Sequence, residues 1–180
     1  MKIAITGHTA GIGRSLANSY SSRGHEIVGL SKRNGDNIRN IMKISQQIEP
    51  CDMWINNAQD GFAQTELLFE IARRWQGTRK HIMVISTIMT QQPSSSLPGL
   101  DMDLYRVQKV ALEESVRQIR NRHLRINFTL VRPGNIATSA DKTVPPAADV
   151  DRWAETLVKL FETTDPDLVI SEISLAPRPI

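Results

Sequence analysis

The sequence has little of what several classes of protein depend on. Cys51 is the only cysteine, so no internal disulfide can form, and a reducing compartment such as the cytoplasm is expected. No apolar run approaches the roughly 20 residues that a membrane-spanning helix needs. The 4 histidines are scattered without metal-ligand spacing, so no metal site is expected.

Charge and aromatic content are also low. The net charge is +3, and aromatic residues make up 5% of the chain. No run of lysine and arginine is interleaved with aromatic side chains, which argues against a nucleic-acid partner. The chain opens on an apolar strand rather than a signal peptide. Its length of 180 residues suits a single domain, spanning residues 1–180. No membrane partner is expected.

Short apolar runs alternate with segments whose apolar residues recur at helical spacing. Strands are expected at residues 3–5, 25–30, 53–55, 81–85, 126–131 and 168–175. Helices are expected from residue 14, then near 38–48, 67–75, 104–119 and 153–161. Strands separated by helices of this length predict an α/β fold, with a doubly wound parallel sheet covered by helices on both faces in three α/β/α layers.

A glycine-rich turn joins the first strand to the first helix, in the segment from Thr6 to Gly13. A strand, a tight glycine turn and a helix place the helix N-terminus against a dinucleotide phosphate. Glycine is needed because a Cβ would keep the backbone from the pyrophosphate or from a positive φ. By itself, the pattern is equally compatible with a turn that binds nothing, since short glycine patterns recur by chance.

Polar residues follow several expected strands, at the sheet edge where α/β folds bind ligands. Ser86 and Thr87 follow the strand at 81–85, and a hydroxyl there could hold a substrate carbonyl. Tyr105 and Lys109 share one face of the next helix. A tyrosine whose pKa is lowered by an ammonium could act as a general acid. Taken alone, a packed tyrosine beside a surface lysine is the simpler interpretation.

Four motifs occur in a fixed order: Thr6-Gly7-x-x-x-Gly11-Ile12-Gly13, Asn56-Asn57-Ala58, Tyr105-x-x-x-Lys109, and Arg132-Pro133-Gly134 with Thr138. This combination resembles the short-chain dehydrogenase/reductase family along nearly the whole chain. The resemblance implies a Rossmann-type sheet that binds NAD(P) and a Ser/Thr-Tyr-Lys active site. By position, Thr87 rather than Ser86 matches the family's catalytic hydroxyl, and both are retained. The residues expected to bind the cofactor are Gly7, Thr9, Gly11, Ile12, Gly13, Ser31, Lys32, Arg33, Asp36, Asn57, Ala58, Tyr105, Lys109, Pro133, Gly134, Ile136 and Thr138.

The activity that the resemblance implies is hydride transfer between nicotinamide and a small carbonyl or alcohol substrate. Tyr105 would be the general acid or base, and Lys109 would lower its pKa and hold the ribose hydroxyls. Thr87 or Ser86 would orient the substrate. The segment from Pro133 to Thr138 would hold the nicotinamide carboxamide.

Three departures from the family pattern stand out. The stretch from Asn37 to Met53 has room for one helix and little more than a stub of a third strand. The family's relay asparagine would fall near Gly61, where Gln59, Gln64 or water could replace it. The loop at residues 139–149 is short, which predicts a reduced lid and an open pocket.

Two other functions are compatible with the sequence. The missing asparagine and the short lid suggest a non-catalytic dinucleotide-binding regulator or scaffold of the same fold. A lyase or epimerase using the cofactor transiently is disfavoured because no sizeable C-terminal substrate domain follows. The resemblance also implies a homodimer or homotetramer, paired through the helices after Asn57 and around Tyr105. The apolar residues expected to support pairing are Leu67, Leu68, Ile71, Trp75, Val107, Val110, Leu112 and Ile119.

The end of the second strand bears on the choice of cofactor. An NAD-specific site usually carries an acid there, which accepts hydrogen bonds from ribose hydroxyls. By position this residue is Ser31, and Lys32 and Arg33 follow it as partners for a 2′-phosphate. Thr9 could add a hydroxyl, and Asp36 would face the adenine, as an acid there does in the resembled family. The sequence therefore predicts NADP(H) ahead of NAD(H), although adjacent basic residues are also common in solvated loops.

Overall fold

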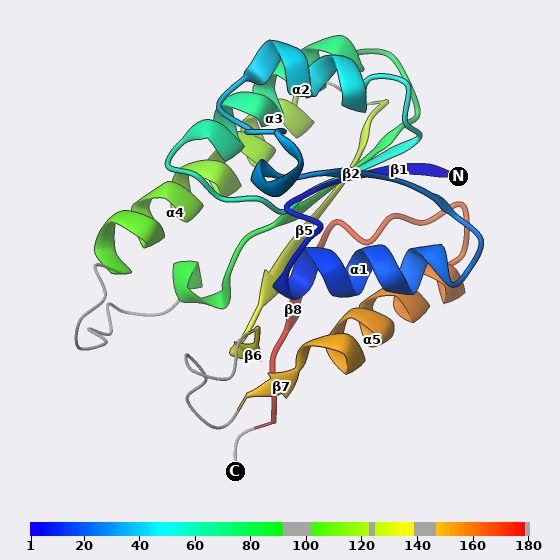
Figure 1. Ribbon diagram of the computed structural model, residues 1–180, viewed down its shortest axis with the longest axis vertical. Coiled ribbons are helices and arrows are strands. Elements are labelled where there is room, and N and C mark those ends of the chain that lie inside the picture. Colours follow the sequence, from blue (N-terminus) through cyan, green and yellow to red (C-terminus); the bar gives the residue numbers. More distant parts are fainter. Residues whose placement is uncertain (92–101, 123–124, 139–146, 179–180) are drawn as a thin grey trace.

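The computed structural model describes residues 1–91, 102–122, 125–138 and 147–178. Its centre is a parallel sheet that lies between two layers of helices (Figure 1). The strand order in this sheet is β2-β1-β3-β4-β5-β8. The six strands are β1 Lys2–Thr6, β2 Glu26–Leu30, β3 Met53–Asn56, β4 His81–Ile85, β5 Asn127–Pro133 and β8 Glu172–Leu175. Two strands that the sequence pattern does not reveal, β6 Ile136–Ala137 and β7 Ala148–Asp149, pair with each other in parallel.

The helices form the outer layers. Helices α1 (Gly11–Ser21) and α5 (Val150–Thr163) pack together on one face of the sheet. The other face carries α2 (Ile41–Ile48), α3 (Ala63–Arg74) and α4 (Met102–Arg120), as Figure 1 shows. The predicted three-layer doubly wound fold is therefore confirmed. Among the described residues, no helix is both long and apolar enough to span a membrane.

Alternation along the strands sends side chains to two separate cores. In β1, Ile3 and Ile5 join the core beneath α1 and α5, whereas Ala4 joins the core beneath α2, α3 and α4. Both faces are covered, so the central strands β1, β3 and β4 are mostly apolar on both sides. Trp54 and Trp75 are the largest fully buried side chains of the core beneath α2, α3 and α4.

The expected third-strand stub is not a strand in the structure. Between β2 and β3 the chain forms a short 3-10 turn at Lys32–Asn34 and then helix α2. Strand β2 is consequently an edge strand, paired only with β1. The segment after β2 therefore lies directly beside the loop that follows β3, which shapes the site described below.

The apolar residues expected to support pairing mostly serve the chain's own core. Because α3 and α4 pack against each other and against the sheet, six of them are buried: Leu67, Leu68, Ile71, Trp75, Leu112 and Ile119. Val107 and Val110 of α4 remain exposed. Other apolar side chains on this side of the molecule are exposed too, namely Phe62, Phe69 and Leu104.

Candidate functional site

The glycine turn after β1 has the backbone geometry that its sequence predicts. Gly7 and Gly11 have positive φ angles of 76° and 51°. A Cβ on Gly13 would lie 2.3 Å from the Gly7 carbonyl oxygen, so only glycine allows this approach of helix to strand. The N-cap of α1, Ala10, makes no side-chain cap, and the first turn holds no acid. The helix therefore presents uncapped N–H groups of the kind that bind phosphate.

The Asn56-Asn57-Ala58 segment is fixed against this turn by Thr6. The backbone N–H groups of Asn57 and Ala58 both donate to the Thr6 hydroxyl, at 3.1 and 3.2 Å. The side-chain amide of Asn57 donates to the Thr6 carbonyl at 3.0 Å. Two sequence motifs that lie 50 residues apart thus meet at the edge of the sheet formed by the C-terminal ends of its strands, and this edge, from Ser31 to Thr138, is called the groove below.

A cavity of about 380 Å³ lies at one end of this groove, between the glycine turn and the segments after β2 and β3. The hydroxyl oxygen of Ser31 is buried at this cavity and has no hydrogen-bond partner among the described residues. Such an atom is suited to a ligand hydroxyl. The predicted cofactor residues that line the cavity are Gly7, Thr9, Ser31, Lys32, Arg33, Asp36, Asn57 and Ala58.

The charges around this cavity are paired in a way that the sequence does not reveal. Asp60 bridges Lys32, at 2.6 Å, and Arg39, at 2.7 Å. Hydrogen bonds from Arg39 and Lys32 hold the pKa of the Asp60 carboxyl well below its usual range. The sequence did not indicate Arg39 or Asp60 as site residues. The two side chains come together because no strand forms between β2 and β3.

Asp36 lines the same cavity, but its carboxylate is already engaged. It accepts a hydrogen bond from the Gln47 side chain at 3.1 Å and pairs with Lys43 at 3.0 Å, both residues of α2. Asp36 therefore lines the cavity while its charge is directed to α2, and its contact with an adenine stays a prediction.

Thr87 and Ser86, at the end of β4, point to different partners. The Thr87 hydroxyl is hydrogen-bonded to the side chain of Tyr105 on α4. The Ser86 hydroxyl donates instead to the buried carboxylate of Glu113, at 2.6 Å. The structure therefore brings Thr87 to the tyrosine and directs Ser86 away from it.

Lys109 lies under the tyrosine but is bonded elsewhere. Its ammonium is 5.7 Å from the centroid of the Tyr105 ring and donates to Gln64 Oε1 and to the Ile85 carbonyl, both at 2.9 Å. Burial lowers the pKa of Lys109 to about 8, against the opposing effect of the Glu113 charge.

The expected lowering of the Tyr105 pKa is not what the structure shows. Burial of the phenol raises its pKa, and the hydrogen bond with Thr87 offsets this only in part. The physical reason is that the lysine ammonium is directed to Gln64 and Ile85 rather than to the phenol oxygen.

Of the two glutamines considered as replacements for the relay asparagine, Gln64 is the one that reaches Lys109. Its side chain is almost fully buried, and its amide donates to the carbonyls of Asn56, at 2.9 Å, and Ile85, at 3.2 Å. These bonds orient its oxygen toward the lysine. Gln59 is bonded to Gln108 instead.

The sequence did not reveal a buried ion network behind Ser86 and Thr87. Glu113 accepts two hydrogen bonds from the Arg132 guanidinium, at 3.0 and 2.7 Å, and one each from Ser86 and Thr90. Arg132 also pairs with Glu172 of β8 at 2.8 Å. The network joins α4, the end of β4, β5 and β8.

The Pro133-Gly134 segment and Thr138 lie at the far end of the groove. The Gly134 N–H donates to the Leu175 carbonyl at 2.9 Å, which attaches this segment to the chain after β8. A Cβ on Gly11 would lie 3.3 Å from the Thr138 side chain. Thr138 and the glycine turn are therefore neighbours, as a ligand spanning both would require.

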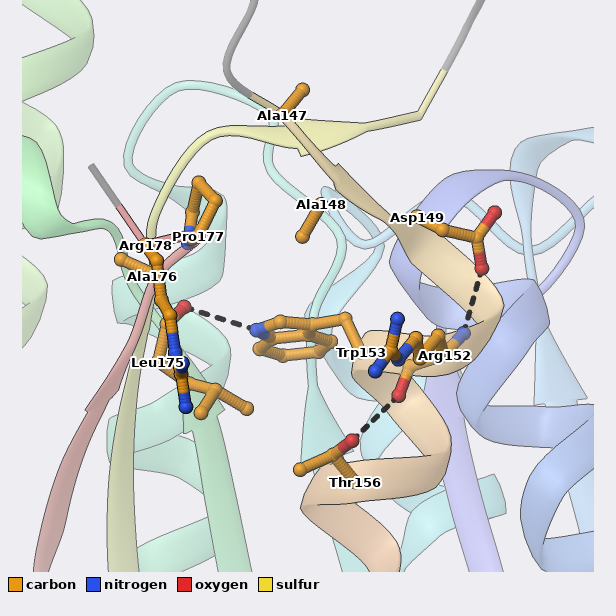
Figure 2. A pocket seen from close by; sticks show the side chains of 10 residues that line it. All are labelled: Ala147, Ala148, Asp149, Arg152, Trp153, Thr156, Leu175, Ala176, Pro177 and Arg178. Atoms are coloured by element: carbon orange, nitrogen blue, oxygen red, sulfur yellow. Dashed lines mark hydrogen bonds between the residues drawn. The ribbon is translucent and has the colours of Figure 1, made fainter. Parts of the chain in front are cut away.

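A larger cavity, of about 760 Å³, lies outside this groove. It is bounded by β7, the first turns of α5 and the residues after β8 (Figure 2). Trp153 of α5 is one of the residues that line this cavity, and it donates its indole N–H to the Leu175 carbonyl at 3.0 Å. None of the residues predicted for the site lines this cavity.

Comparison with known proteins gives structural neighbours. No family model and no curated protein matches the sequence. An alcohol dehydrogenase from the archaeon Thermococcus sibiricus, complexed with 5-hydroxy-NADP, is 16% identical over 97% of this chain and 96% of its own, with a TM-score of 0.75. A Burkholderia cenocepacia short chain dehydrogenase in complex with NADP is 15% identical over 97% of this chain and 87% of its own, with a TM-score of 0.75.

A third solved structure is similar to the same extent. The 4-hydroxyisoleucine dehydrogenase complexed with NADH is 14% identical over 98% of this chain and 97% of its own, with a TM-score of 0.76. The likeness thus extends over nearly the whole length of both chains in each case. Together with the strand order and the glycine turn, these neighbours show that the chain has the fold of the short-chain dehydrogenases/reductases.

Proposed function

We propose that the protein is an NADP(H)-dependent oxidoreductase of the short-chain dehydrogenase/reductase type, acting on a small carbonyl or alcohol substrate. The observation that carries this proposal is the placement of Tyr105, with Thr87 hydrogen-bonded to it and Lys109 under its ring. This group lies at the same edge of the sheet as the uncapped helix and glycine turn, as hydride chemistry on a dinucleotide requires.

The groove fits the proposed cofactor. The glycine turn and the N-terminus of α1 would hold the pyrophosphate, and the orphaned Ser31 hydroxyl would meet the adenosine ribose. Pro133, Gly134, Ile136 and Thr138 would hold the nicotinamide end. When bound, the cofactor supplies or accepts the hydride, while the protein provides orientation and proton transfer.

Proton transfer falls to Tyr105. Because burial raises its pKa, the phenol keeps its proton at neutral pH and can donate it to a substrate oxygen during reduction. Thr87 is close enough to the phenol to orient the same oxygen. Lys109 carries its ammonium below about pH 8, where it can hold ribose hydroxyls and favour negative charge at the reacting oxygen.

The preference for NADP(H) is supported by the residues after β2. No acid stands at Ser31, whereas Lys32 and Arg33 both line the adenosine end of the groove. Either cation can contact a 2′-phosphate, and arginine can do so with two hydrogen bonds.

The decisive experiment compares the chain's two tyrosines. Tyr105→Phe should lower the turnover of NADPH with a panel of aldehydes and ketones by at least about a hundredfold, because general-acid catalysis contributes that much. Its dissociation constant for NADPH should change little, since the ring still packs. Tyr20→Phe, a buried tyrosine remote from the groove, is the matched control and should retain full turnover.

Near-normal turnover in Tyr105→Phe would contradict the proposed mechanism. Dinucleotide binding without turnover of any substrate in the wild type would favour the alternative, a non-catalytic dinucleotide-binding regulator or scaffold. Lys109 is bonded to Gln64 and Ile85 rather than to the phenol oxygen of Tyr105. This observation supports the non-catalytic alternative.

We also propose that the protein is located in a reducing compartment such as the cytoplasm. We further propose that it forms a homodimer or homotetramer. Phe69 of α3 and Val107 and Val110 of α4 are 46%, 56% and 42% exposed, on two helices that pack against each other, and could form one apolar contact surface. Light scattering at micromolar concentration is expected to give a mass above that of one chain, and Val107→Lys should reduce it. A monomeric wild type would rule the assembly out.

A further inference from the structure

One carboxylate of the 380 Å³ cavity, that of Asp60, divides its two oxygens between two cations from the segment after β2. Asp60 Oδ2 lies 2.6 Å from Lys32 Nζ, and Oδ1 lies 2.7 Å from Arg39 Nη2. Asp60 follows β3, whereas both cations follow β2, so the ion pairs bridge the cavity's two walls. The cations are 63% and 66% exposed, but the carboxylate is only 15% exposed. Ion pairs whose cations face water are weak and can be exchanged for a better anion.

Arg39 reaches this position because the chain makes a tight turn where a further strand would otherwise start. Its backbone N–H donates to the Asn37 side chain at 3.0 Å, and Asn40 then caps α2 through the Lys43 N–H. This local turn, together with the edge position of β2, directs Arg39 to the loop after β3. Lys32, Arg33 and Asp60 line the cavity, and Arg39 pairs with Asp60, so three cations lie in or beside this cavity.

Two ligand groups would meet Asp60 with opposite results. A free ribose hydroxyl can donate a hydrogen bond to a carboxylate, which favours a dinucleotide without the 2′-phosphate. A phosphate monoester in the same place is repelled by the carboxylate and attracted by the three cations. The same side chain therefore acts on the two dinucleotides in opposite directions.

We propose that Asp60 is the residue that limits the preference for NADP(H): it occupies Lys32 and Arg39 until a 2′-phosphate displaces it. Arg39 then joins Lys32 and Arg33 as a ligand of that phosphate. This inference rests on the proposed function, because it presupposes that the groove binds a dinucleotide.

The test is calorimetric titration of NADP⁺ and NAD⁺, with 2′,5′-ADP and 5′-AMP as fragments that need no turnover. Asp60→Asn should tighten NADP⁺ and 2′,5′-ADP by about tenfold, the effect expected for one charge-assisted contact, and should weaken NAD⁺. Arg39→Ala should weaken NADP⁺ and 2′,5′-ADP by a similar factor and leave NAD⁺ and 5′-AMP unchanged. Asp52→Asn, which neutralises an exposed carboxylate that accepts a hydrogen bond from the Lys2 backbone N–H, controls for net charge and should change neither affinity.

The outcomes separate this inference from the proposed function. If NADP⁺ binds the wild type but Asp60→Asn shifts both dinucleotides by the same factor, or shifts neither, the role of Asp60 is overturned while the proposed function stands. An unchanged affinity of Arg39→Ala for 2′,5′-ADP would remove Arg39 from the phosphate site. If the wild type binds no dinucleotide or fragment, the proposed function fails, and this inference fails with it.

Discussion

The two ends of the groove, proposed above as its adenosine end and its catalytic end, hold their charges in opposite ways. At the adenosine end, the cations that pair with Asp60 are more than half exposed, and the pairs lie at the surface. At the catalytic end, Arg132 and Glu113 are each only 6% exposed, and hydroxyls and a second carboxylate complete their bonding. Both clusters contain carboxylates and cations, so burial and not composition makes the difference.

This difference decides what each cluster can do. A surface ion pair gains little from its partner, so a ligand phosphate can take that partner's place. A buried pair cannot be opened without leaving a charge unsatisfied in a low-dielectric interior, so it acts as a fixed support. We infer that the catalytic end is held rigid by Glu113, which binds the residue before Thr87 and the residue before Pro133.

The largest effect is expected when the buried cluster is broken. Glu113→Gln should lower the free energy of unfolding by about 3–5 kcal/mol, because it leaves the Arg132 guanidinium buried beside a neutral group. Urea unfolding with linear extrapolation measures the change. Glu114→Gln is the control: Glu114 is the next residue, is 50% exposed and pairs with Arg117, so its loss should be far smaller. Equal losses in the two variants would contradict the contrast between buried and exposed pairs.

A second, smaller effect is expected from the titration of Lys109, the buried lysine. Because burial lowers the pKa of Lys109 to about 8, its ammonium is present below that pH and lost above it. The turnover rate should therefore fall about tenfold per pH unit above 8. Over the same range stability should rise, since between pH 8 and 10.5, the ordinary pKa of a lysine, the unfolded chain binds more protons than the folded one.

Lys109→Met is the variant that checks both trends. It removes the titrating group, so its residual activity and its free energy of unfolding should show no inflection near pH 8. A wild-type profile that stays flat to pH 10 would show that the lysine keeps its proton in the folded enzyme.

The fold was predictable because each element carries its own local signal. The strands β1, β3 and β4 are largely apolar runs, the first turn is marked by its glycines, and α2 ends just before Pro50. The exceptions are β6 and β7, which are two residues each and therefore too short to have a period. The sequence suggested a larger exposed apolar surface for pairing than the structure shows. A helix that packs against both a sheet and another helix uses a wider apolar stripe than a helix with a single neighbour, so more of its apolar residues are buried.

The candidate site was predictable only where a motif specifies the residue. Tyr105, Lys109 and Thr87 come together as the motifs imply, but their partners could not be inferred. By its i, i+4 spacing, Glu113 shares the helix face of Tyr105 and Lys109 and is buried, whereas Glu114 lies off that face and is exposed, but the sequence does not show which side chains Glu113 bonds. Such bonds are set by tertiary packing, which a single sequence does not record.

The smallest effect is expected at the exposed pair, and a double-mutant cycle measures it directly. Lys32→Ala, Asp60→Asn and the double variant should give a coupling free energy under about 1 kcal/mol at low salt, because the Lys32 ammonium is 63% exposed. The coupling should lie at the low end because Arg39 still neutralises Asp60 when Lys32 is removed. Screening at 1 M NaCl should abolish it, since the Debye length then falls to about 3 Å. The matched cycle of Glu113→Gln with Arg132→Met should give a coupling several times larger that persists in salt. If the Lys32–Asp60 coupling were equally large and salt-resistant, the adenosine end would be as rigid as the catalytic end, and a 2′-phosphate could not displace Asp60.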